Sequence, residues 1–216
     1  MDRRNLTAAL ATIVFFALAC IYFIPAANLR EILPGIVVKY RIIGPLAALT
    51  LAGAALIPWQ MTLAMGFSLA GDFMGAYGCF IGQMGFFALA HIMLITWLAG
   101  RLRQGGRICK GAVIADAAAV AFLVTFALTC IIPHAPAGVI RTGCAVYAIL
   151  ICSMLGLALL QRSLILAAGA ALFLLSDMIL SWNKFVSPVE NSRWLIMVPY
   201  YAGQILLWTS AFKARK

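Results

Sequence analysis

The stretch that decides the fold is Leu164–Trp182, which reads LILAAGAALFLLSDMILSW. Apolar and small side chains fill it, and Asp177 is its one charged residue. A helix needs roughly 20 apolar residues to cross a bilayer. This stretch therefore predicts a transmembrane helix that carries a single carboxylate inside the membrane.

Seven other stretches are long and apolar enough to be interpreted in the same way: Leu6–Ile24, Ile36–Ile57, Met61–Tyr77, Phe80–Ala99, Ala112–Ile132, Val139–Leu160 and Trp194–Phe212. The second is the weakest, because Lys39 and Arg41 lie in its first turns and Pro45 interrupts it. Both basic side chains can reach the headgroups from there. We predict an all-α protein, a polytopic membrane helix bundle of about eight transmembrane helices that forms a single domain over residues 1–216.

Composition supports this prediction. Of the 216 residues, 65% are hydrophobic and only 10% are charged, whereas a soluble domain carries roughly 25% charged residues. The net charge of +10 comes from basic residues between the apolar runs, where membrane topology and anionic headgroups explain it. We expect the lipid bilayer as a partner and no nucleic acid, and the sequence leaves the oligomeric state open.

Basic residues also predict the orientation. With the N-terminus inside, the cytoplasmic segments hold ten of them: Arg3, Arg4, Arg101, Arg103, Arg107, Lys110, Arg162, Lys213, Arg215 and Lys216. The opposite side holds six: Arg30, Lys39, Arg41, Arg141, Lys184 and Arg193. Cytoplasmic loops are enriched in Lys and Arg. Both termini are therefore expected in the cytoplasm, which requires an even number of spans.

Two segments resemble each other within the chain. Residues 67–74 read FSLAGDFM and residues 173–180 read FLLSDMIL, which suggests a parallel repeat of four spans plus four. Chance similarity among apolar residues is the alternative. No phosphate loop, serine elbow or dinucleotide fingerprint occurs, and the six cysteines are scattered without partner histidines at ligand spacing. We expect neither a cofactor nor a metal site.

Three carboxylates lie within the apolar runs, at Asp72, Asp116 and Asp177. Asp116 follows a basic loop closely, so anchoring at the interface explains it. Asp72 and Asp177 each lie about a dozen residues into their helices, which places them at a similar depth because an ideal helix rises about 1.5 Å per residue. An ionised carboxylate there costs at least ~2.5 kcal/mol. The two carboxylates are therefore expected to be paired with another group, hydrated or used in the protein's function.

Other polar residues in the membrane have two interpretations each. His91 can act as acid, base or hydrogen-bond orienter, or can join two helices. Gln204, with Tyr200 one turn before it and Tyr201 beside that, can bind a polar substrate, although the tyrosines also suit an interfacial aromatic belt. Asn183 and Lys184, at the end of their helix, suit a lipid phosphate or plain anchoring.

These segments together resemble the YhhN family of multi-pass membrane proteins, whose characterised members are lysoplasmalogenases. The resemblance rests on four segments: the glycine-rich one around Asp72, Phe87-Ala88-Leu89-Ala90-His91, Ser176-Asp177 with Asn183-Lys184-Phe185, and Tyr200-Tyr201-Ala202-Gly203-Gln204. One departure concerns a Lys-Pro-Leu segment of the family, which reads Gly44-Pro45-Leu46 in this chain. Lys39 or Arg41 would have to replace the missing lysine.

The resemblance implies hydrolysis of the vinyl-ether bond of a lysoplasmalogen, with release of a fatty aldehyde and a glycerophospho-headgroup. That reaction needs an acid that protonates the alkene and an anion beside the oxocarbenium ion that forms. Asp72 and Asp177 would supply both, since two carboxylates at one depth tend to share a proton. His91, Asn183, Lys184, Tyr200, Tyr201 and Gln204 would bind the lysophospholipid or orient water.

Two other functions fit the same polar residues. A small transporter or channel can use Asp72 and Asp177 as a proton or cation site. A non-catalytic lipid-binding protein can use them only as interhelical hydrogen bonds, for which Ser68 and Ser181 lie one turn away. Turnover by purified protein without a membrane gradient favours the enzyme, and gradient-dependent uptake favours the transporter.

Overall fold

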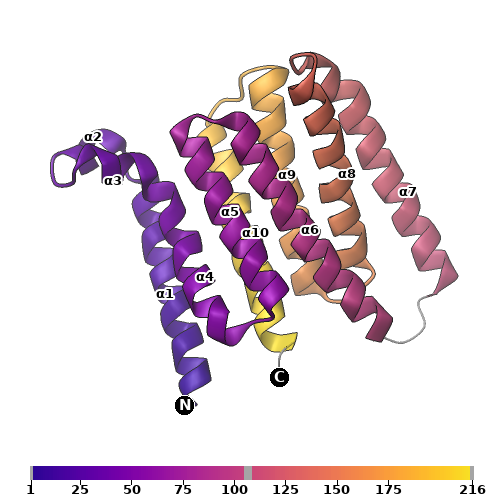
Figure 1. Ribbon diagram of the computed structural model, residues 1–216, viewed down its shortest axis with the longest axis horizontal. Helices are drawn as coiled ribbons and strands as arrows, with labels where there is room; N and C mark the ends of the chain where they lie inside the picture. The colour runs from indigo at the N-terminus through magenta and orange to yellow at the C-terminus, as the bar shows by residue number, and fades with distance from the viewer. Residues whose placement is uncertain (1, 105–108, 215–216) are drawn as a thin grey trace. The chain divides into compact units, whose positions relative to one another are not determined.

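A computed structural model describes residues 2–104 and 109–214, and helices dominate both ranges (Figure 1). Within these residues, seven helical segments are long and apolar enough to cross a membrane: Arg3–Phe23, Gly35–Leu56, Phe80–Gln104, Lys110–His134, Val139–Leu159, Leu164–Phe185 and Ser192–Ala214. The chain is thus an all-α, integral multi-pass membrane protein, as the sequence predicts. Of the basic residues counted for orientation, Arg107, Arg215 and Lys216 lie outside the described residues.

The second of the expected spans, which is the weakest prediction, is not one continuous α-helix. The segment predicted at Ile36–Ile57 forms as α3 (Gly35–Tyr40), η1 (Arg41–Ile43) and α4 (Gly44–Leu56) and belongs to the seven. Pro45 lies in the first turn of α4, where its missing N–H costs nothing. The segment predicted at Met61–Tyr77 forms as α5 (Trp59–Tyr77) but does not belong to them, because its glycines and polar side chains lower its hydropathy.

The described helices form two compact units. The first unit comprises residues 2–90 and 211–214, with α1 (Arg3–Phe23) packed on α4 and α4 packed on α5. Short helix α2 (Ala26–Arg30) follows α1. Gly78 ends α5 with a φ of 97°, a left-handed conformation that favours glycine.

The two ends of the chain meet in this first unit. The Arg4 guanidinium donates a hydrogen bond of 3.0 Å to the Phe212 carbonyl oxygen and lies 4.6 Å from the centre of the Phe212 ring. Arg4 belongs to the first turn of α1, and Phe212 lies near the end of α10 (Ser192–Ala214). The start of α1 and the end of α10 are therefore neighbours.

The second unit comprises the described part of residues 91–210. It contains the later part of α6 (Phe80–Gln104), then α7 (Lys110–Phe126), η2 (Ala127–Ile131), η3 (Ile132–His134), α8 (Val139–Leu159), α9 (Leu164–Phe185) and most of α10. Helix α8 packs against both α7 and α9. Helix α7 has no buried residue, so most of its surface is available to lipid.

Helices α9 and α10 approach each other at two glycines. A Cβ atom added to Gly203 would lie 2.9 Å from the Gly169 carbonyl oxygen and 3.0 Å from the Phe173 nitrogen. Small residues permit such backbone contact between membrane helices. The crossing fixes the positions of Phe173 and the residues that follow it on α9 against α10.

Candidate functional site

Asp177 lies on the buried face of α9 in the second unit, with only 8% of its surface exposed. The Tyr147 hydroxyl, on α8, donates a hydrogen bond to its Oδ2 atom. Among the described residues, Tyr147 is the hydrogen-bond partner of this carboxylate, and no hydrogen bond is made to Oδ1. The carboxylate is thus held by one oxygen, and the other is left for a further partner.

His91, on α6, is completely buried and contacts aromatic residues that also surround Asp177. Its ring lies edge-on to Tyr147, with 5.2 Å between the ring centres and 83° between the planes. It also lies 4.8 Å from the centre of Phe173, one turn before Asp177 on α9. The structure therefore brings His91 and Asp177 to the same tyrosine.

Helix α10 adds three of the expected residues. Tyr200 lies edge-on to Phe173, with 5.5 Å between the ring centres, and Tyr201 lies at the same distance from Tyr200. Both tyrosines are buried, so they do not form an interfacial belt. Gln204 is buried one turn later, and its Nε2 atom has no hydrogen-bond partner in the described part of the chain.

Asn183 and Lys184 lie outside this group. They follow Asp177 by six and seven residues on α9, roughly 9–10 Å along the helix axis. The Asn183 side-chain oxygen accepts a hydrogen bond of 2.8 Å from the Val189 nitrogen and so holds the turn after the helix. Lys184 is exposed.

Asp72 lies on α5 in the first unit and is 3% exposed. Buried Ser68 precedes it by one turn. Two glycines on α5 allow side chains from the start of α6 to approach. A Cβ atom at Gly71 would lie 2.9 Å from the Phe87 ring, and one at Gly75 would lie 2.8 Å from the Gln83 amide. Asp72 is thus enclosed by close helix packing.

The two basic residues expected to replace the missing lysine differ in their surroundings. Arg41 donates hydrogen bonds to the carbonyl oxygens of Tyr22, Ile24 and Val38, so it ties α3 and η1 to the end of α1. Lys39 is exposed, and its ammonium lies 5.2 Å from the centre of the Tyr40 ring and 5.8 Å from that of Tyr77. Of the two side chains, that of Lys39 is the exposed one.

Sequence reasoning missed Tyr147. It is the tyrosine of α8, eight residues after the helix begins at Val139. Tyrosines of interfacial belts lie near helix ends. A tyrosine in the interior of a span could therefore have been recognised as a candidate functional residue. Its partner could not be named, since the sequence does not say which neighbouring helix the ring faces.

Comparison with known proteins supports the family resemblance. The YhhN family model matches residues 35–211. The chain is 42% identical over 48 residues to lysoplasmalogenase TMEM86B of Sus scrofa, a match covering 22% of this chain and 21% of that protein. It is 41% identical over 63 residues to lysoplasmalogenase TMEM86A of Bos taurus, covering 29% and 26%.

A third relative, lysoplasmalogenase TMEM86A of Homo sapiens, is 45% identical over 49 residues, which cover 23% of this chain and 20% of the relative. The chain therefore matches about a fifth to a quarter of the length of these relatives. No solved structure matches the chain.

Proposed function

Because the chain belongs to the YhhN family, we propose that it hydrolyses the vinyl-ether bond of a lysoplasmalogen. The products would be a fatty aldehyde and a glycerophospho-headgroup. The observation that carries the proposal is the buried Asp177 carboxylate, which Tyr147 holds by one oxygen beside His91. A membrane protein keeps an ionisable group at such a position at considerable cost, which favours a functional use.

The reaction requires two proton-transfer groups. A carboxylic acid protonates the alkene carbon farther from the ether oxygen, and the adjacent carbon becomes part of an oxocarbenium ion. A carboxylate accepts a proton from water as the water oxygen attacks that carbon. The hemiacetal that results gives its hydroxyl proton to the carboxylate that protonated the alkene. Its bond to the glycerol oxygen breaks as that oxygen takes a proton from the other carboxyl group, and the aldehyde leaves. One water is consumed, and both carboxyl groups return to their starting states.

Asp72 and Asp177 are the proposed pair, and the proposal requires both to face one substrate. Asp72 lies 13 residues beyond Trp59, where α5 begins, and Asp177 lies 13 residues beyond Leu164, where α9 begins. Glycosidases divide the same two tasks between carboxylates around a similar cation. His91, Tyr200, Tyr201 and Gln204 would bind the lipid or orient water, and Asn183 and Lys184 would contact its headgroup.

Lys39 is the proposed replacement for the lysine that the family carries in its second helix. Its ammonium lies over the rings of Tyr40 and Tyr77, and Tyr77 follows Asp72 by five residues on α5. Lysine binds phosphate as a point charge. Lys39→Gln is therefore expected to raise KM several-fold with little change in kcat, whereas exposed Arg30→Gln, with the same loss of charge, leaves both unchanged.

We also propose that the whole chain acts as one transmembrane domain with both termini in the cytoplasm. The contact between Arg4 and Phe212 supports an even number of crossings, because it joins the two ends. With seven apolar segments, α5 would supply the eighth. Reporter fusions after Lys216 should behave as cytoplasmic, and an external reporter signal would contradict this topology.

The test of function is aldehyde release by purified protein in detergent, measured by mass spectrometry. Two substrates are matched: an alkenyl lysolipid with the vinyl ether and the alkyl lysolipid with a saturated ether. We expect aldehyde from the first and none from the second, with no need for a membrane gradient. Uptake of protons or cations into vesicles, without aldehyde release in detergent, would favour a transporter instead.

A further inference from the structure

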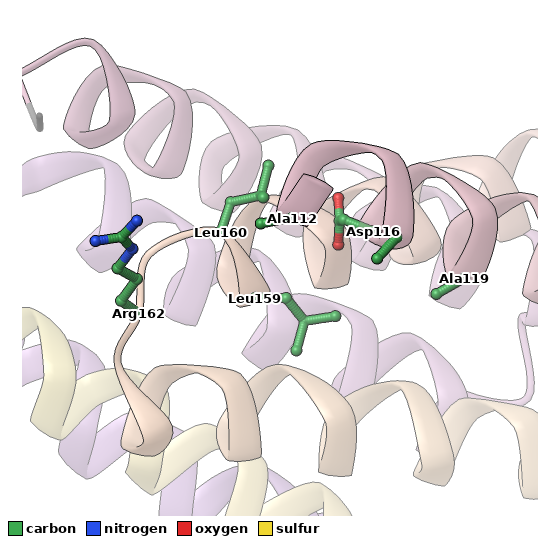
Figure 2. A pocket seen from close by; sticks show the side chains of 7 residues that line it. Ala112, Asp116, Ala119, Leu159, Leu160 and Arg162 are labelled. Carbon is green, nitrogen blue, oxygen red and sulfur yellow. The ribbon is translucent and has the colours of Figure 1, made fainter. Parts of the chain in front are cut away.

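A pocket opens in the second unit between the beginning of α7 and the end of α8. Its volume is about 360 Å³, and its walls are formed by Ala112, Ala115, Asp116, Ala119, Leu159, Leu160 and Arg162. Figure 2 shows Asp116 and Arg162 on either side of the two leucines. The pocket is within the range of small-ligand sites, roughly 300–1,000 Å³. It shares no lining residue with the group around Asp177.

Gly156 places the Asp116 carboxylate in this pocket. A Cβ atom at Gly156 would lie 2.9 Å from Asp116 Oδ2 and 2.8 Å from a Val120 methyl group, so both side chains of α7 lie directly over this glycine of α8. Asp116 Oδ1 is buried and has no hydrogen-bond partner among the described residues. A buried carboxylate oxygen without a donor is costly, and a ligand with a hydroxyl group would satisfy it.

Arg162 supplies the opposite charge at the mouth of the pocket. It follows the end of α8 in the turn toward α9, with a left-handed φ of 54°. No ion pair joins its guanidinium to Asp116 or to another described residue. Because α7 and α8 are consecutive antiparallel helices, this turn lies on the same membrane side as Lys110, the first residue of α7. Asp116 lies six residues farther, roughly 9 Å deeper.

We propose that this pocket binds a lysophospholipid, with its phosphate on Arg162, its free glycerol hydroxyl on Asp116 and its single chain along the alanines of α7. A phospholipid carries its phosphate at the interface and its glycerol deeper, which is the order of Arg162 and Asp116. A lysophospholipid keeps one glycerol hydroxyl free, whereas a diacyl lipid has none there to donate. The site therefore selects the single-chain lipid.

The inference does not depend on vinyl-ether hydrolysis, since any lysophospholipid offers these groups. Binding at this pocket would hold a lipid at the membrane face on which α7 begins. Helix α7 has no buried residue, so a lipid can reach the pocket laterally from the bilayer.

The test uses a probe that cannot be hydrolysed: a lysophosphocholine with a saturated alkyl ether chain and a photoreactive diazirine near the glycerol. The full chain in lipid nanodiscs is irradiated with increasing probe, and adducts are mapped by mass spectrometry. We expect saturable adducts within residues 112–119 and 159–162. Saturable labelling confined to other segments would overturn the proposal.

Matched variants test the two contacts. Arg162→Gln and Asp116→Leu are each expected to weaken probe binding ~10-fold or more, because a hydrogen bond to a charged group is lost. Asp116→Asn keeps an acceptor oxygen and should stay within ~3-fold of the parent. Arg103→Gln, with the same charge loss on an exposed residue of α6, should change nothing. Equal binding by Arg162→Gln and Arg103→Gln would contradict the phosphate contact.

Competing lipids test the hydroxyl contact without any mutation, so the proposal stays testable if Asp116→Leu fails to fold. On the parent protein, the probe's analogue with a methylated glycerol hydroxyl should compete ~10-fold less well than the unmethylated lipid. This loss on methylation should be no larger on Asp116→Asn than on the parent. Diacyl phosphatidylcholine and chain-free glycerophosphocholine should compete poorly. Equal competition by the methylated or the diacyl lipid would overturn selection of a lysophospholipid.

Discussion

Asp177 and Asp116 are both carboxylates inside membrane helices of the second unit, and their surroundings are opposite. Asp177 lies in the interior with a tyrosine hydroxyl on one oxygen and a histidine beside that tyrosine. Asp116 lies in an open pocket on a helix without buried residues, and its buried oxygen lacks a donor. The first arrangement suits proton transfer in a water-poor site, and the second suits binding of a hydroxyl-bearing lipid.

Asp→Asn substitutions should have very different effects on kcat at these two carboxylates, and the loss at Asp177 should be the greatest of the effects predicted for this protein. Asparagine keeps the shape and hydrogen bonding of aspartate but cannot transfer the proton. Asp177→Asn and Asp72→Asn should each lower kcat for aldehyde release by ~10²–10⁴-fold, while Asp116→Asn should lower it little. The double variant should be scarcely worse than either single one, because groups that act as a unit are not additive.

A well-folded Asp177→Asn protein with the parent rate would remove Asp177 from the mechanism. A well-folded Asp72→Asn protein with the parent rate would do the same for Asp72. Thermal unfolding in the same detergent provides the folding control for each variant.

Next in size is a change that disturbs the Asp177 region without touching a polar group. Gly203→Ala adds a methyl group 2.9 Å from the Gly169 carbonyl oxygen, a backbone atom that cannot rotate away. Forcing α9 and α10 apart should cost ~1–3 kcal/mol of stability and lower kcat. Gly100→Ala, where an added methyl group meets nothing within 4 Å, is the matched control for both measurements. Equal stability of the two variants would show that the helices can separate at no cost.

A smaller effect is expected at Tyr147. Tyr147→Phe removes the hydroxyl that donates to Asp177 and keeps the ring beside His91. Loss of a hydrogen bond to a charged group should lower kcat by about 10-fold or more, with KM nearly unchanged. Tyr40→Phe, whose ring stacks on Phe73 in the first unit, serves as the control. If the Tyr147→Phe enzyme keeps its kcat and only its KM rises, the hydroxyl acts in substrate binding instead.

The smallest effect concerns Cys109, directly before α7 and close to the pocket. The backbone N–H groups of Ala112 and Gly111, with a contribution from the Arg162 charge, lower the pKa of its thiol. A lowered pKa means that more thiolate is present at neutral pH, so alkylation should reach half its maximal rate at a lower pH than for an ordinary cysteine. Arg162→Gln should move that midpoint upward, and Cys109→Ser should abolish labelling within residues 109–119. If the pH midpoint is unchanged in Arg162→Gln, the Arg162 charge does not influence the Cys109 thiol.

Much of the site could be predicted from the sequence because polar residues are rare in these helices. Asp177, His91, Tyr200, Tyr201 and Gln204 were identified as polar or aromatic interruptions of apolar runs. The structure gathers the first three around Tyr147 and Phe173, and Tyr201 lies against Tyr200. Tyr147 itself was missed, and so was the pocket at Asp116, for which the sequence indicated only anchoring.

The fold class follows from the amino-acid sequence, because apolar runs of this length must cross the bilayer and only a helix can satisfy their backbone hydrogen bonds there. The sequence also shows which side chains are costly to place in lipid. The tertiary structure alone decided which of them meet: Tyr147 with Asp177, Gly169 with Gly203, and Asp116 with Arg162 in one pocket. The physical reason is that lipid-facing and buried helix faces are both apolar here, so the pattern of hydrophobic residues does not fix the rotation of a helix about its axis.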